Sequence, residues 1–324
     1  MYIRIRKVKT SAFNRKGHMI RAVMTGFFLT FFTTASNGQF EPQFTQYMFN
    51  EMFINPAYAG SRECISITGA YRNQWAGMEG APKTQTASIH SPLKNNRTAL
   101  GLSLMNEEIG VTSDLSVFGS YAYRVHTVKG TFSMAVSGGL IHHQEKLPEL
   151  NVGAFGDYVF MGVPRATVPN AGFGTYFNTD DFYIGISIPR LLQNRPDRGT
   201  GRPLNKINVD LWHYYLMGGY VFPLNDNLKL RTTCMIKAVS GAPVIADIGA
   251  HLRFNDHLWL GGSYRTSDSW SGMFQLQLNP QMRLGYSYDY TLTRLRTFNS
   301  GTHEITLGID ISRDREKPVA VRNF

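Results

Sequence analysis

The chain alternates repeatedly between apolar and polar side chains with a period of two. In VIADIGAHLRF, Val244 to Phe254, apolar side chains recur at every second position, and Asp247, His251 and Arg253 fall between them. A β-strand points successive side chains to opposite faces, so such a segment predicts a strand with one apolar and one polar face. This pattern, rather than any long apolar run, constrains the fold.

About fourteen segments of the chain carry this pattern. Most are roughly 8 to 12 residues long, which is the length that a tilted strand needs to cross a bilayer. The segments lie near residues 64–74, 84–91, 97–105, 114–126, 130–142, 171–178, 181–188, 210–222, 227–237, 243–254, 257–266, 270–278, 281–291 and 302–312.

The links between these segments alternate in length. Every second link is a short turn rich in Asn, Asp and Pro, such as 127–129 and 255–256, whereas 143–170 and 189–209 are long. Aromatic residues also gather near the expected strand ends, at Trp75, Trp212, Tyr214, Trp259, Trp270 and Tyr290. These features predict an all-β, transmembrane outer-membrane β-barrel of about 14 antiparallel strands, with long loops extracellular and both termini periplasmic. A soluble β-sandwich would not sort its loops by length in this way.

Composition agrees with a membrane barrel. Hydrophobic residues make up 43% of the chain, charged residues only 17%, and there are 31 glycines, whereas about 25% charged residues is usual in soluble proteins. The face opposite the apolar one carries both signs of charge and no ring of a single sign, which indicates a water-filled or plugged interior rather than an ion-selective path. Its charged residues are Lys229, Arg231, Lys237, Asp247, Arg253, Arg283, Asp289, Glu304 and Asp310.

The first 38 residues have the features of a signal peptide. They contain seven basic and no acidic residues, and the apolar run 22–35 is followed by small residues at Ser36 and Gly38. Without them the net charge falls from +10 to +3, so the basic balance does not indicate nucleic-acid binding. We therefore expect a signal peptide at 1–38, a periplasmic N-terminal segment at 39–63, the barrel at 64–312 and a periplasmic tail at 313–324.

No catalytic constellation, phosphate-binding loop or cofactor fingerprint is present, so we predict neither an enzyme nor a cofactor. His142 and His143, with Glu145 nearby, lie at the start of the long link 143–170, and such a pair in a loop is more often solvated than metal-bound. Cys64 and Cys234 lie in separate strand-like stretches, and we expect two thiols rather than a disulfide.

The stretch YMFNEMFINPAYAGS, Tyr47 to Ser61, is aromatic, Met-rich and nearly uncharged. It precedes the first predicted strand. It could plug the lumen, line the barrel base, present a docking surface for a partner, or pack only for stability. The candidate docking residues are Tyr47, Met48, Phe49, Asn50, Phe53, Asn55, Pro56 and Tyr58.

Three parts of the chain carry a family resemblance. QFEPQFTQYMFNEMFINPAYAGS (39–61), YRNQW with APKTQTASIHSPL (71–75 and 81–93), and GYSYDYTLTRLRTFNSGTHEITLGID (285–310) resemble the PorP/SprF family of type IX secretion proteins from Bacteroidetes. The resemblance spans essentially the whole mature chain, although the middle is generic barrel.

The resemblance implies an outer-membrane barrel that serves type IX secretion as a partner-specific accessory. It would act as receptor or anchor for a secreted surface protein or adhesin, recognised through a C-terminal domain, and in gliding bacteria would be linked to gliding motility. Periplasmic ring components and peptidoglycan-binding proteins of the same system are further implied partners, alongside outer-membrane lipid. A small-solute outer-membrane channel is the alternative.

Overall fold

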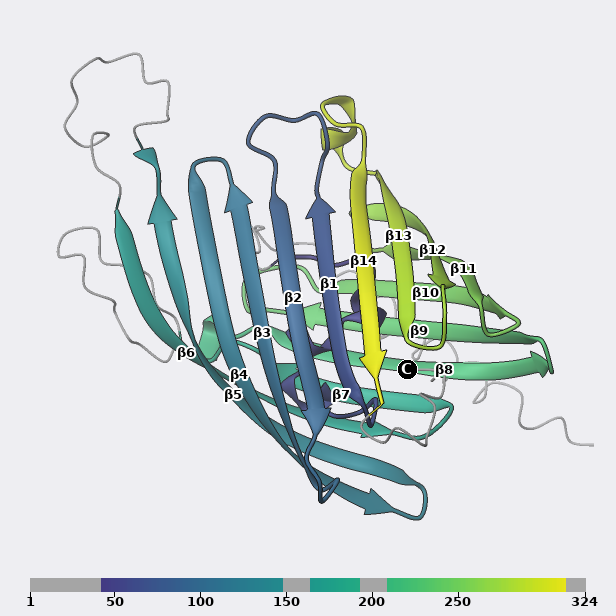
Figure 1. The fold of residues 1–324 in the computed structure, drawn as a ribbon. Coiled ribbons are helices and arrows are strands. Elements are labelled where there is room, and N and C mark those ends of the chain that lie inside the picture. The colour runs from purple at the N-terminus through teal and green to yellow at the C-terminus, as the bar shows by residue number, and fades with distance from the viewer. Residues whose placement is uncertain (1–41, 148–163, 193–208, 313–324) are drawn as a thin grey trace, which may run out of the picture. The chain divides into compact units, whose positions relative to one another are not determined.

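The computed structural model describes residues 42–147, 164–192 and 209–312. Within them, antiparallel strands form a closed barrel in which each strand pairs with its neighbours in sequence (Figure 1). The strands are β1 (Ile65–Asn73), β2 (Lys83–Pro92), β3 (Thr98–Ile109), β4 (Thr112–Thr127), β5 (Gly130–Glu145), β6 (Arg165–Asn178), β7 (Phe182–Ile188), β8 (Tyr214–Asn225), β9 (Leu228–Ala238), β10 (Ile245–Phe254), β11 (Leu258–Arg265), β12 (Ser269–Gln277), β13 (Met282–Thr291) and β14 (Thr302–Ile311).

The barrel closes because β1 pairs with both β2 and β14. Along the closing seam the register runs from Ile65 opposite Ile311 to Asn73 opposite His303. Closure leaves no strand without a neighbour, which satisfies the backbone of a sheet that lies in lipid. The predicted antiparallel barrel of about 14 strands is confirmed.

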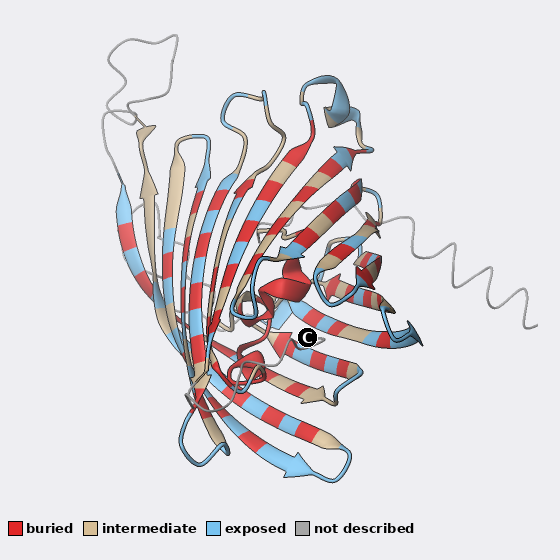
Figure 2. Ribbon diagram, turned by 45° about the vertical axis from the view of Figure 1, so that its right-hand side comes forward, coloured by how far each residue is buried: buried red, intermediate tan, exposed pale blue. Residues whose placement is uncertain are grey.

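Side chains alternate between the outer surface and the lumen, as the sequence pattern predicted. In β10, Ile248 is 57% exposed on the outer face, whereas Asp247, His251 and Arg253 are buried inside. Figure 2 shows this as buried and exposed bands that alternate along the strands. The outer face is apolar, whereas most lumen-facing side chains of the strands are polar.

The links sort into two ends of the barrel. At one end, which we call the short-link end, strands are joined by residues 93–97, 128–129, 179–181, 226–227, 255–257 and 278–281. At the other, the long-link end, the links are 74–82, 110–111, 146–164, 189–213, 239–244, 266–268 and 292–301. β14 ends at the short-link end, and in Figure 1 the short links after β2 and β4 lie at the bottom while the link between β1 and β2 lies at the top.

Four strands are longer at the long-link end than the alternation predicted. β3, β4, β5 and β6 extend toward that end, so the long loop expected at 143–170 shrinks to 146–164, and 110–111 is a tight turn. The extended parts carry polar side chains such as Glu108 and His143, so they lack the apolar face that marks a strand in lipid. Pro169 lies in β6 opposite Leu140 of β5, and the pairing of β6 with β7 begins at Phe173, so this part of β6 is an edge that tolerates proline.

One aromatic residue was assigned to the wrong face. Trp270 and Tyr290 are 56% and 51% exposed on the outer surface, as an interfacial aromatic band requires. Trp259, which was expected in the same band, is buried in the lumen, where the guanidinium groups of Arg231 and Arg253 lie 5.7 and 5.2 Å from the centre of its ring. Its neighbours Leu258 and Leu260 hold the outward positions of β11.

The two cysteines do not form a disulfide, as expected. Cys64 is buried and Cys234 lies on the outer face of β9. No helix in the described ranges is long and apolar enough to cross a membrane.

Candidate functional site

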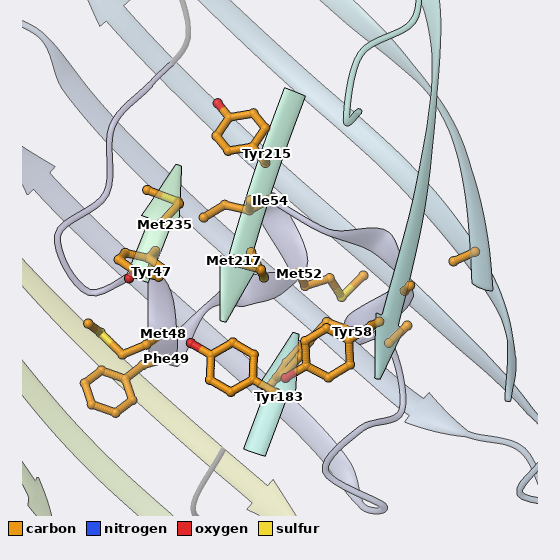
Figure 3. Packing of buried hydrophobic residues seen from close by; sticks show 14 of the residues in the cluster. Tyr47, Met48, Phe49, Met52, Ile54, Tyr58, Tyr183, Tyr215, Met217 and Met235 are labelled. Carbon is orange, nitrogen blue, oxygen red and sulfur yellow. The ribbon is translucent and has the colours of Figure 1, made fainter. Parts of the chain in front are cut away.

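The lumen holds the chain's own N-terminal segment, residues 42–64, which we call the lumen segment. It contains three short 3₁₀ helices, η1 (Tyr47–Phe49), η2 (Glu51–Phe53) and η3 (Pro56–Tyr58). Their side chains pack against apolar lumen residues of β7, β8 and β9, including Tyr183, Met217 and Met235 (Figure 3). The apolar core of the described barrel therefore lies inside the lumen and is built around this segment.

The lumen segment runs along the lumen from one end to the other. Thr45 lies beside Arg72 and Asp289, which stand at the long-link ends of β1 and β13. The Gly60 N–H donates to Nδ1 of His90 (3.1 Å) near the short-link end of β2, just before β1 begins. The structure thus places residues 42–64 inside the barrel, whereas a periplasmic segment was expected at 39–63 with its start at the short-turn side.

Three charged side chains from neighbouring strands hold the start of the segment, and we call them the seam clamp: Arg72 of β1, Asp289 of β13 and Glu304 of β14. The two carboxylate oxygens of Glu304 accept hydrogen bonds from the backbone N–H groups of Thr45 and Gln46, both at 2.9 Å. The Thr45 hydroxyl donates to Asp289, and Arg72 donates to Asp289 and Glu304 at 2.8 Å.

The seam clamp crosses the pairing that closes the barrel. All three of its side chains are at most 3% exposed, so their charges are compensated by one another and by the segment rather than by water. Buried charges are tolerated only when they are paired and hydrogen-bonded in this way. Binding of the segment in the lumen therefore also supplies hydrogen-bond partners to the buried charges at the β1–β14 seam.

Two more arginines hold carbonyl groups of the segment. Arg265 of β11 donates to the Phe44 carbonyl (3.0 Å) and pairs with Asp247 (3.1 Å). Arg231 of β9 donates to the Met48 carbonyl at 3.2 Å. At the opposite end, Asp310 of β14 pairs with Arg62 at 2.7 Å.

The middle of the segment fits between glycines of the wall. The Asn55 side chain caps η3 by accepting from the Ala57 N–H (2.9 Å), and it donates to the Thr175 carbonyl of β6 (2.9 Å). A Cβ added to Gly174 would lie 2.1 Å from Asn55 Oδ1, and one added to Gly185 2.6 Å from its Nδ2. Only glycine allows the wall to approach this side chain so closely.

Glu51 is the one carboxylate of the segment that is buried in the middle of the lumen. It is 0% exposed, and its carboxylate lies 3.8 Å from Arg231. Burial raises the pKa of Glu51 from 4.5 to about 7, although Arg231 acts in the opposite direction. The protonation of this group therefore changes near neutral pH.

The structure brings the eight candidate docking residues together, but inside the barrel. All are buried except Phe53, which is half-buried and lines two small cavities of about 50 and 60 Å³ next to Pro189 and Arg190. In this arrangement a partner at the mouth of the barrel can contact Phe53 at most. A docking role for the other seven side chains requires the segment to leave the lumen.

Sequence reasoning identified only some of the residues that hold the segment. Asp289, Glu304 and Asp310 were assigned to the lumen, and the structure confirms their burial there. Arg72 and Arg265, which pair with them and with Asp247, were not singled out. Arg72 and Arg265 directly follow the outward residues Tyr71 and Tyr264, so the period-two pattern could have assigned both arginines to the lumen.

The described residues contain no group of three His, Cys, Asp or Glu side chains arranged to hold a metal ion. His142 and His143 lie within β5 and not in a loop. The His143 ring nitrogens contact Asp114 and Glu145, while Nδ1 of His142 contacts Thr167 (2.9 Å). Hydrogen bonding between neighbouring strands accounts for these histidines.

Comparison with solved structures finds outer-membrane barrels. The CymD monoaromatic hydrocarbon channel is 13% identical, with 81% of this chain and 91% of that chain covered and a TM-score of 0.50. Omp33 of Acinetobacter baumannii is 12% identical, with coverages of 77% and 98% and a TM-score of 0.44. At such identities the likeness concerns the fold alone. Comparison with curated proteins gave no match.

The family comparison is more specific. The model of the type IX secretion system membrane protein PorP/SprF matches residues 36–309, which include the lumen segment and every strand except the end of β14. It agrees with the prediction of a non-enzymatic outer-membrane barrel. The chain therefore belongs to the PorP/SprF family of type IX secretion system membrane proteins.

Proposed function

We propose that this barrel is a closed accessory of type IX secretion that acts as receptor or anchor for one exported protein, such as a surface adhesin of a gliding cell. Its long-link end faces the outside and the end of β14 faces the periplasm. The exported protein, or its C-terminal domain, binds at the outer end. Periplasmic ring or peptidoglycan-binding components of the system bind at the short-link end.

The observation that supports this proposal is the filled lumen. The lumen segment occupies the interior with buried side chains, and Glu304, Arg265 and Arg231 bond its backbone directly. A passive pore would leave a continuous water-filled path through its centre. A barrel whose centre is filled by its own chain has its ends and links left for contact with other proteins.

The same observation weighs against the alternative, a small-solute channel. Two cavities of about 50 and 60 Å³ lie over Phe53, but neither is large enough for an open pore. Conduction would require the segment to leave, which would expose the buried charges of the seam clamp. The likeness to the CymD channel is a likeness of fold at 13% identity and carries no substrate.

The proposal is tested by purifying the tagged, full-length protein from outer membranes in mild detergent and identifying what remains bound. A stoichiometric exported protein with a type IX C-terminal domain is the expected result. Recovery of only periplasmic ring components would make the barrel a scaffold of the machine and would overturn the receptor role. Recovery of no protein, together with clear single-channel conductance, would establish the channel.

The orientation is tested separately by adding protease to intact cells. Cleavage is expected within 146–164 or 189–213 and not in the turn at 255–257. Cleavage confined to that short turn would reverse the proposed orientation.

A further inference from the structure

Two links at the long-link end are tied together into one rigid surface, which we call the loop platform: residues 74–82 between β1 and β2, and residues 292–301 between β13 and β14. The Ala76 N–H donates to the Gly301 carbonyl and the Ser300 N–H donates to the Ala76 carbonyl, both at 2.7 Å. The Trp75 N–H donates to the Thr302 hydroxyl at 3.1 Å. The two links therefore behave as a short continuation of the sheet.

Asn299 fixes the second link from within. Its side chain donates to the Leu295 carbonyl (2.6 Å) and accepts from the Gly301 N–H (2.8 Å) and the Thr291 hydroxyl (3.2 Å). Gly301 has a φ of +93°, and a Cβ there would lie 2.5 Å from the Tyr288 ring, so the turn needs glycine. The conformation of this link is set before any partner arrives.

The fixed link presents two cations and one aromatic ring to the surroundings. Arg294 and Arg296 are exposed on the 3₁₀ helix η7 (Arg294–Thr297), and Phe298 directly after it is 70% exposed. Neither arginine forms an ion pair with a residue that the structure describes, and Glu79, the sole carboxylate of the two links, does not reach them. The arginines inside the lumen are held by carboxylates or by the segment, so these two differ from them.

The platform rises beyond the aromatic band of the wall. Trp270 and Tyr290 form part of that band, and the backbone of Leu292 still bonds to the β11–β12 turn through Asp268 (2.8 Å). Arg294 and Phe298 follow after the chain has left the wall, on the curled link that stands above β13 and β14 in Figure 1. Their position favours contact with another protein over contact with lipid.

We propose that the loop platform docks an acidic segment of the exported protein, with Arg294 and Arg296 binding its carboxylates and Phe298 packing against its apolar side chains. This inference rests on the proposed function, which places the long-link end outside the cell. Arginine and aromatic side chains contribute most to binding at protein interfaces, and a pre-ordered loop loses little entropy on binding. The unpaired positive charge selects an acidic partner.

The test places a photo-reactive phenylalanine analogue at position 298 of the full-length protein in its native cells. The matched control carries the same group at position 128, because Val128 is fully exposed on the short-link turn 128–129. Irradiation is expected to give, from position 298 only, an adduct with an exported protein whose cross-linked peptide is acidic. No adduct, or an adduct with lipopolysaccharide alone, would overturn the proposal.

Charge reversal gives the second readout. Arg294→Glu combined with Arg296→Glu should abolish the adduct, whereas Lys94→Glu combined with Arg97→Glu makes the same charge change on the exposed 93–97 link and should leave the yield unaltered. Asn299→Ala retains both arginines and Phe298 and should lower the yield about threefold or more, because the loop must then be ordered on binding. An adduct that survives the double reversal contradicts the assigned chemistry.

The two proposals fail in different ways. If the purified barrel retains an exported protein but position 298 gives no adduct, the platform is not the docking site and the receptor function stands. If neither experiment yields an exported protein, both proposals are wrong. Heat-dependent mobility on gels reports whether each variant barrel has folded.

Discussion

Glu304→Gln tests how the lumen segment is held. The carboxylate of Glu304 accepts the N–H groups of Thr45 and Gln46 and pairs with Arg72, all at 2.8 to 2.9 Å. Glutamine has nearly the same shape, but it keeps only one acceptor oxygen. Its NH2 group would point at a backbone N–H or at the guanidinium group of Arg72, and both of those are donors.

The expected cost follows from those contacts. Hydrogen bonds to a charged group contribute about 1.5–3 kcal/mol each, and breaking a buried ion pair costs about 3–5 kcal/mol. Because one acceptor survives and the segment keeps its bonds to Arg265 and Arg231, we expect seating to weaken by about 2–4 kcal/mol. That difference corresponds to roughly 30- to 1000-fold faster hydrogen exchange of the Thr45 and Gln46 amides, which exchange when the segment leaves its place.

Hydrogen exchange followed by mass spectrometry of the detergent-solubilised barrel measures this quantity in the peptide that contains Thr45 and Gln46. Asp226→Asn is the matched control, because it makes the same acid-to-amide change on the β8–β9 link 226–227, where Asp226 is exposed. The control should exchange like the wild type. An exchange rate in Glu304→Gln within about threefold of the wild type would refute the claim that the seam clamp seats the segment.

Three further predictions follow from the same structure. Ile248→Arg places a charge on the lipid-facing side of β10 and should destabilise the assembled barrel by about 2–4 kcal/mol near the bilayer midplane. His257→Arg on the adjoining link should leave assembly unchanged. Equal loss of folded barrel in the two variants would contradict the face assignment. Gly174→Ala should destabilise the folded barrel by about 1–3 kcal/mol, because the added Cβ would clash with Asn55. Gly138→Ala, whose Cβ would meet nothing within 4 Å, should cost less than about 1 kcal/mol. Similar unfolding midpoints for the two variants would contradict close packing of Asn55 against Gly174. Because the pKa of Glu51 rises from 4.5 to about 7, the lumen favours its protonated form, and its contribution to seating is complete below about pH 4.5 and is lost as the pH rises through about 7. Exchange of the segment should therefore be slower at pH 5 than at pH 8 after correction for intrinsic rates, and Glu51→Gln should remove the difference while Glu79→Gln on the exposed 74–82 link should retain it.

The barrel could be predicted from the sequence because the face to which each side chain points follows from the alternation within its own strand. In β10, alternate residues point to the lipid and to the lumen. Lipid requires each outward side chain to be apolar, so the alternation can be recognised from the residue types alone. The prediction failed where that requirement ends. His143, Gln144 and Glu145 lie in the extension of β5, where side chains need not be apolar, so nothing in the local pattern marks them as strand.

The location of the lumen segment inside the barrel could not be predicted from local alternation. Thr45 bonds to Glu304 across most of the chain, and no periodicity connects positions so distant in sequence. The low charge and the Met and aromatic content of 47–61 left several roles open, and plugging of the lumen was one of them. Choosing among these alternatives required the partner residues, namely the charges of the seam clamp and the glycines opposite Asn55.

Planar-bilayer conductance of the purified full-length barrel, beside a variant that lacks residues 42–58, tests the central claim most directly. A barrel closed by its own N-terminal segment should show no steady conductance, and the deletion variant should either conduct or fail to close its seam, as read from heat-dependent mobility. Stable ohmic conductance of the wild type, equal to that of a well-folded deletion variant, would show that the segment does not close the lumen and would contradict the account.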